Sequence, residues 1–488
     1  MANFLQIPVA LRAPGTYVEF DSTRALGGLL NIPERALLIG PMTSSGTVSE
    51  GIAVRTNARL SDGQAGTGSF LSEMVKYFDD VNQSTELWML PVLPGGGSIA
   101  TIKLIKFGGT ATASGSVYLY IAGRRYVVPV AKAATADQVA TSATALVSAD
   151  VTALVSAAVD GGDTTKVNFT AKCEGAIGDT IDVRVNYGDF DSTVAGITTL
   201  IATDVSGAGV PSLTTPLDNL GEEEFGYIGC AYRDTGSLTA MESFLADRES
   251  ATVQKEGIGF FVASDTYGNL QTLGNSQNSQ LYSILGVEEN SPTPESLIAA
   301  SYCGIGAFNL ANDPARPLNT LELQGVSAVA NSTRFTWSER NTLLYDGIAT
   351  TRVVQGGKVV IDRAITTYQT NNQSVPDPAY LDITTVATLF YIRKQLRFSI
   401  GLTYPRHKIG PDAMVIRPGT AIVRPRDVKG LCIAVLRSME QIGIVENVNQ
   451  DTVFVERDPS DQTRINIILS PDLVNGAHVF AAQVQFQL

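Results

Sequence analysis

The C-terminal stretch opens YLDITTVATLFYIRKQLRFSIGLTYPRHKI (380–409) and closes VENVNQDTVFVERDPSDQTRINIILSPDLVNGAHVFAAQVQFQL (445–488). The opening segment places apolar residues at helical spacing, whereas the last residues alternate strictly between two faces. One face carries Phe480, Ala482, Val484, Phe486 and Leu488, and the other carries Gln483, Gln485 and Gln487. Alternation with period two predicts a half-buried strand. Because free chain ends normally fray, we expect this terminal strand to pair with a partner.

The same stretch contains an unusual concentration of positive charge. Residues 391–437 hold ten Lys or Arg against two acids, a net charge of +8 in a chain that carries −13 overall. We call five of these cations the basic patch: Arg393, Lys394, Arg397, Arg406 and Lys408. The patch is either a solvated face with scattered ion pairs inside the chain or an electropositive surface matched to an acidic partner. Nucleic acid is a poor candidate, because the chain is acidic and few aromatic residues interleave with these cations.

Several motifs in order along the chain resemble the Mu-like bacteriophage contractile tail sheath proteins. The C-terminal ones are YPRHK (404–408), MEQIGIVEN (439–447), VERDPSDQTRINIIL (455–469) and SPDLVNGAHV (470–479). Upstream are PGTYVEFDSTRALGGL (14–29), TELWMLPV (85–92), ERNTLLYDGIATT (339–351) and GGKVVIDRAITTYQTN (356–371). The resemblance implies a structural subunit without enzymatic activity. Such subunits form stacked six-fold rings around a tail tube, and their contraction drives the tube through the host envelope.

The resemblance also implies binding partners, the surfaces that would contact them, and a location in the virion. The partners are further copies of the chain, the tail tube protein, and the baseplate and tail terminator proteins, with no nucleic acid and no membrane insertion. The basic patch would face the tube, and two terminal arms would add strands to neighbouring subunits. The arm residues are Leu5, Ile7, Val9, Leu11, Phe480, Val484, Phe486 and Leu488. The protein would belong to the virion tail and be assembled in the host cytoplasm. The sheath of a phage-derived tailocin or injection system fits the same residues.

The hydrophobic patterns predict a mixed α/β chain with a discontinuous central domain. Buried strands at RALLIG (35–40) and ELWMLPV (86–92) flank a helix with apolar residues at 71, 74, 75 and 78. This alternation of apolar strands and amphipathic helices stops after PGGGS (94–98) and resumes at FGYIGCAY (225–232). We expect an N-terminal arm at 1–30 and a central α/β domain at 31–97 and 217–370, which by resemblance is subtilisin-like. A β-rich inserted domain at 98–216 would be peripheral. A tube-facing α+β domain at 371–478 and a C-terminal arm at 479–488 complete the chain.

Local signals predict where several elements begin and end. Gly356-Gly357 would form the turn of a hairpin over 352–369, and Asp427 would cap a helix that stops at Gly443. The loop GQAGTGS (63–69) precedes a helix that Ser69 or Ser72 would cap. That loop lacks the spacing of a phosphate-binding motif, so we interpret it as a helix-start loop.

No residue set predicts catalysis, a cofactor or a metal site. A subtilisin-like hydrolase is the remaining alternative, but its triad needs a histidine beside a serine and a carboxylate. The chain has two histidines, His407 and His478, and both lie outside the predicted central domain. The four cysteines, Cys173, Cys230, Cys303 and Cys432, form no C-x-x-C pair, so we expect buried thiols of a reducing compartment. No long apolar run predicts a membrane span, and the N-terminus does not resemble a signal peptide.

Overall fold

The computed structural model describes residues 34–188, 190–417 and 419–487, and its chain divides into two compact units. The central unit comprises Pro33–Phe390 together with Asn475–Leu488. The described residues of the C-terminal unit lie within Tyr391–Val474. Helix α9 (Ile383–Thr403) begins in the central unit and ends in the C-terminal unit. The predicted arm residues Leu5, Ile7, Val9 and Leu11, and also Leu488, lie outside the described residues.

A nine-stranded sheet organises the central unit, with the order β14-β16-β15-β13-β12-β11-β1-β3-β2. Neighbours from β15 through β3 pair in parallel, and the remaining edge pairs are antiparallel. The strands are β1 (Arg35–Gly40), β2 (Val54–Arg55), β3 (Glu86–Pro91), β11 (Tyr227–Cys230), β12 (Ile258–Asp265), β13 (Tyr282–Glu288), β14 (Glu322–Ser327), β15 (Ala349–Val354) and β16 (Lys358–Arg363). Strands from 35–91 and from 227–363 therefore share one sheet.

Helices cover both faces of this sheet, so its parallel strands are continuous apolar runs. On one face, α7 (Glu295–Asn312) packs against α2 (Phe70–Val81) and against β1, β11 and β12. Phe260 of β12 points to this face, where its ring meets Tyr302 of α7 edge-on at 5.0 Å. On the opposite face, α5 (Thr235–Glu249) approaches Gly259 through Leu245. Other helices of this unit are α1 (Ala58–Ala65), α4 (Thr214–Asp218), α6 (Tyr267–Asn275) and α8 (Trp337–Tyr345).

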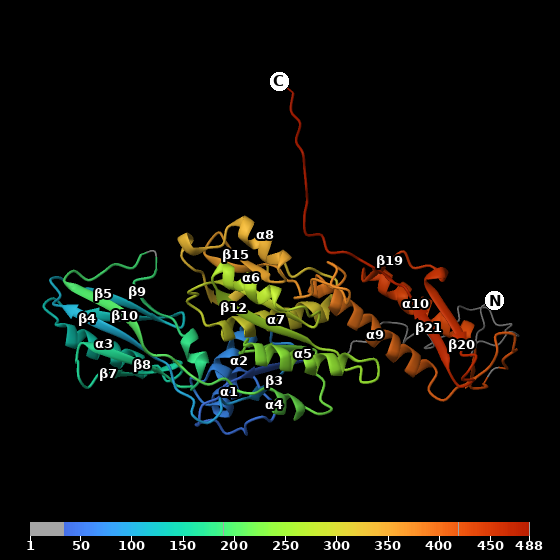
Figure 1. Ribbon diagram of the computed structural model, residues 1–488, viewed down its shortest axis with the longest axis horizontal. Helices are drawn as coiled ribbons and strands as arrows, with labels where there is room; N and C mark the ends of the chain where they lie inside the picture. The colour runs from blue at the N-terminus through green and yellow to red at the C-terminus, as the bar shows by residue number, and fades with distance from the viewer. Residues whose placement is uncertain (1–33, 189, 418, 488) are drawn as a thin grey trace, which may run out of the picture. The chain divides into compact units, whose positions relative to one another are not determined.

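The strands between 102 and 205 form two smaller antiparallel sheets of their own (Figure 1). Their orders are β10-β4-β8-β7 and β6-β5-β9, and α3 (Ala136–Ala149) packs against members of both. The strands are β4 (Ile102–Gly109), β5 (Gly115–Ile121), β6 (Arg124–Val130), β7 (Val155–Val159), β8 (Lys166–Ala171), β9 (Val183–Val185) and β10 (Ile197–Val205). We call this group of elements the inserted lobe.

The C-terminal unit is built on α10 (Pro425–Gln441), which packs against β20 (Val453–Arg457). Strand β20 forms an antiparallel two-stranded sheet with β21 (Ile465–Leu469). The remaining strands are short pairs: β17 (Lys408–Ile409) with β18 (Ile422–Val423), and β19 (Val445–Glu446) with β22 (Asp472–Leu473). The model confirms the mixed α/β class that the sequence predicted.

Most local predictions hold, but some boundaries were wrong. Ser69 caps α2 by accepting the Ser72 backbone N–H at 3.0 Å, and Gly443 follows α10 with a φ of 76°. The N-cap of α10 is Arg424 rather than Asp427, because Pro425 occupies the first turn and Asp427 accepts the Arg424 N–H from inside the helix. The hairpin of β15 and β16 ends at Arg363, and its turn contains the predicted Gly356-Gly357 pair. The loop at 63–69 is shorter than predicted, because α1 extends to Ala65.

Candidate assembly surfaces

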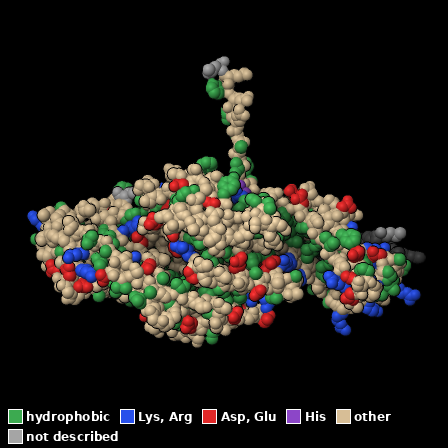
Figure 2. Space-filling model, in the orientation of Figure 1, with side chains coloured by type: hydrophobic (Ala, Val, Ile, Leu, Met, Phe, Trp, Pro, Cys, Tyr) green, Lys and Arg blue, Asp and Glu red, His purple; other side chains and the backbone are tan. Residues whose placement is uncertain are grey.

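The C-terminal segment carries no strand in the single chain, although its sequence alternates perfectly. Residues 474–487 have no assigned secondary structure, and Figure 2 shows the end of this segment standing clear of the folded part of its unit. Its apolar side chains are almost fully exposed: Phe480 is 90% and Val484 87% exposed. A strand needs a neighbour for its backbone N–H and C=O groups. The segment therefore has strand chemistry without a neighbouring strand among the described residues of its own chain.

The first residues of this segment make close contacts with the central unit. Gly476 lies against Pro317, where an added Cβ would come within 2.6 Å of the proline Cγ. Two residues later, the Nδ1 of His478 lies 3.0 Å from the Asn319 Nδ2, and its Nε2 lies 3.6 Å from the Asp382 Oδ1. Burial lowers the pKa of His478, while the charge of Asp382 partly opposes this shift. The ring is therefore a partly buried group in a polar setting.

The two-stranded sheet of the C-terminal unit presents an exposed apolar pair. Phe454 of β20 and Ile468 of β21 are directly opposite in the register and are 52% and 61% exposed. The neighbouring Val453 is buried, on the face that turns toward α10. The alternation in DTVFVER marks Phe454 as facing away from Val453, but sequence reasoning did not single it out. Cross-strand apolar pairs of this kind are typical of a sheet face that another element covers.

All five residues of the basic patch lie in the C-terminal unit. Arg393 and Lys394 are half-buried on α9, and Arg397, Arg406 and Lys408 are exposed. The two acids of this segment make local contacts around the start of α10. Asp427 binds Arg424 at 2.7 Å, and Asp412 accepts the backbone N–H of Arg426 at 2.9 Å. Local pairing therefore accounts for the charge of Arg424.

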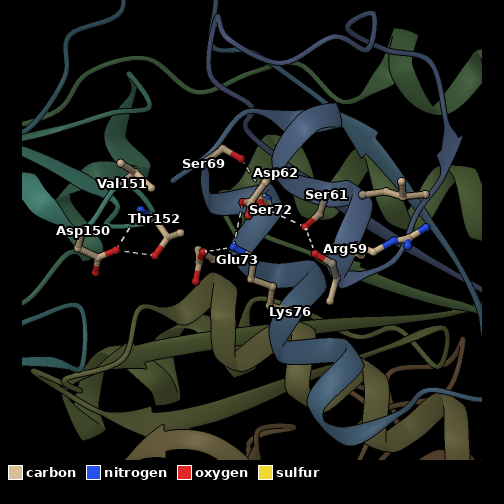
Figure 3. Close-up of polar contacts among 12 residues, drawn as sticks. Arg59, Ser61, Asp62, Ser69, Ser72, Glu73, Lys76, Asp150, Val151 and Thr152 are labelled. Atoms are coloured by element: carbon tan, nitrogen blue, oxygen red, sulfur yellow. Dashed lines mark hydrogen bonds and ion pairs between the residues drawn. The ribbon is translucent and has the colours of Figure 1, made fainter.

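A partly buried ion network joins α1 and α2 to the inserted lobe. Figure 3 shows Asp62, Glu73 and Lys76 on one side of it and Asp150 and Thr152 on the other. Its centre is Glu73, which is only 3% exposed and binds Lys76 at 2.8 Å and also the Arg124 guanidinium of β6. Arg124 in turn binds Asp150 at 3.0 Å and Thr152 at 2.6 Å. Sequence reasoning missed this network, because its members are far apart along the chain and no spacing marks them.

Two acids around this network have a lowered pKa: Asp150, and Asp62 of α1, which binds Lys76 at 2.9 Å. Burial raises the pKa of Asp150, but hydrogen bonds from Thr152 and Tyr126 and the nearby Arg124 outweigh it and lower the pKa to about 2. Burial likewise raises the pKa of Asp62, yet hydrogen bonds from Ser72 and Lys76 leave it below its usual value. Both carboxylates therefore remain charged at neutral pH and hold the network together.

The carboxyl edge of the large sheet holds packed side chains at the position where doubly wound sheets bind ligands. That position lies where the strand order reverses, here between β1 and β11. Cys173, which follows β8 of the inserted lobe, is buried there with its Sγ 3.9 Å from the Pro41 carbonyl oxygen. Tyr232, just beyond β11, is buried as well. The inserted lobe thus helps to fill the crevice.

A neighbouring pocket of about 540 Å³ is lined by charged groups, and three of them pair with one another. Arg233 binds Glu295 at 2.8 Å and lies 3.6 Å from Asp265. Such mutual pairing is typical of structural ion pairs.

The histidines and cysteines make no arrangement that resembles a hydrolytic site in the described part of the chain. His407 meets the Tyr404 ring edge-on at 5.4 Å, and His478 contacts Asn319 and Asp382. All four cysteines are buried and unbridged, and burial raises the pKa of the Cys230 thiol to about 12. Within the described ranges, no cluster of three metal-ligating side chains occurs, and no helix is both long and apolar enough for a membrane span.

Comparison with known proteins identifies the class to which this fold belongs. The sequence-family model for the phage tail sheath protein central domain matches residues 206–367. The family model for the phage tail sheath C-terminal domain matches residues 375–487. Among solved structures, the sheath tail protein of Desulfitobacterium hafniense has a TM-score of 0.51 at 13% identity, covering 95% of this chain and 97% of that chain. The sheath tail protein of Listeria innocua has a TM-score of 0.49 at 12% identity, covering 93% and 95%.

A relative in Haemophilus influenzae narrows this class. The Mu-like prophage FluMu tail sheath protein is 35% identical over 489 residues, which cover 100% of this chain and 99% of the relative. The chain therefore belongs to the phage tail sheath family, among its Mu-like members. It is a structural protein of a contractile tail and thus a component of the virion tail.

Proposed function

We propose that the chain polymerises into stacked six-fold rings around a tail tube and that contraction of this sheath drives the tube through the host envelope. The observation that carries the proposal is the 35% identity with a tail sheath protein along the full length of both chains. The structure supports it physically, because apolar surface on the C-terminal segment and on β20–β21 remains exposed in the single chain. Head-to-tail contacts between copies that do not close into a ring produce a helical filament.

The terminal arms would connect the copies by strand addition. The C-terminal arm (479–488) would pair with an edge of the β20–β21 sheet in a neighbouring subunit, and the N-terminal arm with residues 5, 7, 9 and 11 would do the same. Strand addition satisfies backbone groups on both partners. It would also bring the apolar face of Phe480, Val484 and Phe486 to a sheet that already exposes Phe454 and Ile468.

The basic patch would face the tail tube. Exposed ion pairs contribute only about 0.2–1 kcal/mol each, so a single subunit would bind the tube weakly. Repetition over many subunits would still position the sheath, and weak individual contacts suit a sheath that must release the tube on contraction. The contact should weaken with salt, because the Debye length falls from about 10 Å at 0.1 M to about 3 Å at 1 M.

The remaining assignments follow the proposed architecture. The inserted domain (98–216) would lie on the sheath exterior, the central domain would comprise 31–97 and 217–370, and 371–478 would face the tube. The protein would act without enzymatic activity, as its membership of a structural sheath family suggests. Its further partners would be the baseplate and tail terminator proteins, and assembly would take place in the host cytoplasm.

Electron microscopy of the purified full-length protein tests the proposal directly. We expect hollow tubes with a ringed repeat, because a contracted-type sheath needs no tail tube to form. Discrete monomers at every concentration and salt condition would contradict self-assembly of this chain.

A further inference from the structure

The C-terminal arm begins abruptly, and the residues at its base show why. His478 is 15% exposed in its side chain, whereas the next residue, Val479, is 83% exposed. We propose that His478, held by Asn319 and Asp382, is an anchor that fixes where the arm leaves the central unit. The inference rests on the proposed role of the arm as an intersubunit strand, and it adds the residues that position that strand.

Hydrogen-bond chemistry supports an oriented ring. The Asn319 Nδ2 donates to the His478 Nδ1 at 3.0 Å, so in the neutral ring the proton lies on Nε2. That nitrogen faces the Asp382 Oδ1 at 3.6 Å. A carboxylate on one side and an amide on the other therefore select one tautomer and one ring orientation.

The groups that hold the ring are themselves held by the sheet. Arg363, the last residue of β16, binds both oxygens of Asp382, with two contacts of 3.0 Å. Asp382 also forms a β-bridge with Ile365 and directly precedes α9. A pull on the arm would consequently reach the large sheet through His478, Asp382 and Arg363.

A second contact acts two residues earlier. Gly476 lies so close to Pro317 that a side chain would not fit without a shift of the proline or the chain. Pro317 and Asn319 belong to the same short segment after α7, so residues 476–478 follow one surface. Two contacts on one surface fix the direction of the chain as well as its position.

Loss of the anchor would lengthen the flexible segment that connects the arm to the folded chain. Strand β22 ends at Leu473, in the C-terminal unit, while the anchored residues cluster with the central unit. Without the anchor, the free segment would begin near 474 instead of 479 and would lengthen by about half. Effective concentration falls roughly as the −3/2 power of tether length, so the arm would meet its docking edge about two-fold less often. Loss of the fixed exit direction would add to this effect.

The test uses a fluorophore on the arm of the full-length chain. Ala481→Cys supplies the attachment point, because the four native cysteines are buried. The labelled protein is kept below the concentration at which it polymerises, and its fluorescence anisotropy is compared among three variants. His478→Ala should lower the anisotropy, and Asn319→Ala should lower it less. His478→Asn, whose Oδ1 can replace Nδ1 as an acceptor, should restore most of the original value.

The same variants are then concentrated to measure the threshold for tube formation. The inference predicts a threshold at least about two-fold higher for His478→Ala and near the original for His478→Asn. Unchanged anisotropy in a folded His478→Ala protein would overturn the anchor, whatever the tubes do. Lower anisotropy with an unchanged threshold would overturn its role in assembly. Normal tubes from a chain that lacks the arm would instead contradict the proposed function itself.

Discussion

Strand β13 and the C-terminal arm are both strand-forming sequences, yet they are in opposite states. All seven residues of β13 are buried between two parallel neighbours, β12 and β15. The arm has the cleaner alternation, but its described residues are exposed and form no strand. The difference shows that a strand pattern encodes an ability to pair, while pairing itself depends on which neighbours the fold supplies. For β13 they come from the same chain, and for the arm we propose that they come from another copy.

Removal of the C-terminal arm should have the largest effect on assembly and leave folding unchanged. A chain that ends at Ala482 loses Val484 and Phe486 from the apolar face, and with them the backbone groups that would pair. We expect folded subunits with an unchanged melting temperature that form no tubes in electron microscopy. Replacing Gln483, Gln485 and Gln487 with Ser is the matched control, because it keeps the apolar face and should still allow tubes. Tubes of normal length from the truncated chain would refute the intersubunit strand.

Matched truncations of two phenylalanines should separate folding from assembly. Phe260→Ala removes a fully buried ring that packs on Tyr302 and should lower the free energy of unfolding by about 3–5 kcal/mol. Phe480→Ala removes an exposed ring and should change it by less than about 0.5 kcal/mol. Urea titrations measure both values. For assembly, the order of the two effects should reverse. Phe480→Ala should raise the protein concentration needed for tube formation more than Phe260→Ala does. A large loss of monomer stability in Phe480→Ala would show that the arm packs within its own chain.

The ion network around Glu73 offers a test of the junction with the inserted lobe. Arg124→Met should leave Glu73 buried with Lys76 as its remaining cation and should destabilise the chain by about 2 kcal/mol. Lys132→Met removes an exposed cation from the same lobe and should have little effect. Thermal unfolding of both variants gives the comparison. Equal stabilities would mean that the network contributes little and that apolar packing holds the junction.

Of the predicted effects, charge reversal in the basic patch should have the smallest one for each substituted residue. Arg397→Glu, Arg406→Glu and Lys408→Glu together should impair sheathing of tail tubes, while tubes made by the protein alone should still form. Each contact is worth about 0.2–1 kcal/mol, so the defect should grow with the number of reversed charges and with falling salt. Lys132→Glu is the control for a simple change of net charge. Triple variants that sheathe tail tubes as efficiently as the original protein would refute the tube-facing patch.

Much of the architecture follows from local patterns in the sequence. Apolar runs such as RALLIG and ELWMLPV predicted buried strands, because a parallel strand covered on both faces has no polar side. Ser69 and Gly443 marked helix ends, because a cap is decided by a few neighbouring backbone groups. The motifs also predicted the family, which the full-length relative confirms. Each of these features depends on residues that are close together in the sequence or that recur in a fixed order along it. The sequence alone is therefore enough to detect them.

Other features were decided only by tertiary structure. The pairing of Glu73 with Arg124, the position of Cys173 beside Pro41 and the contact of His478 with Asp382 join residues 51, 132 and 96 positions apart. No periodicity marks such pairs, because their free energy depends on burial and direction, which exist only after the chain has folded. The arm lies at the other limit. Its sequence determined that it can form a strand, and the fold left it exposed because none of the described strands of its own chain pairs with it.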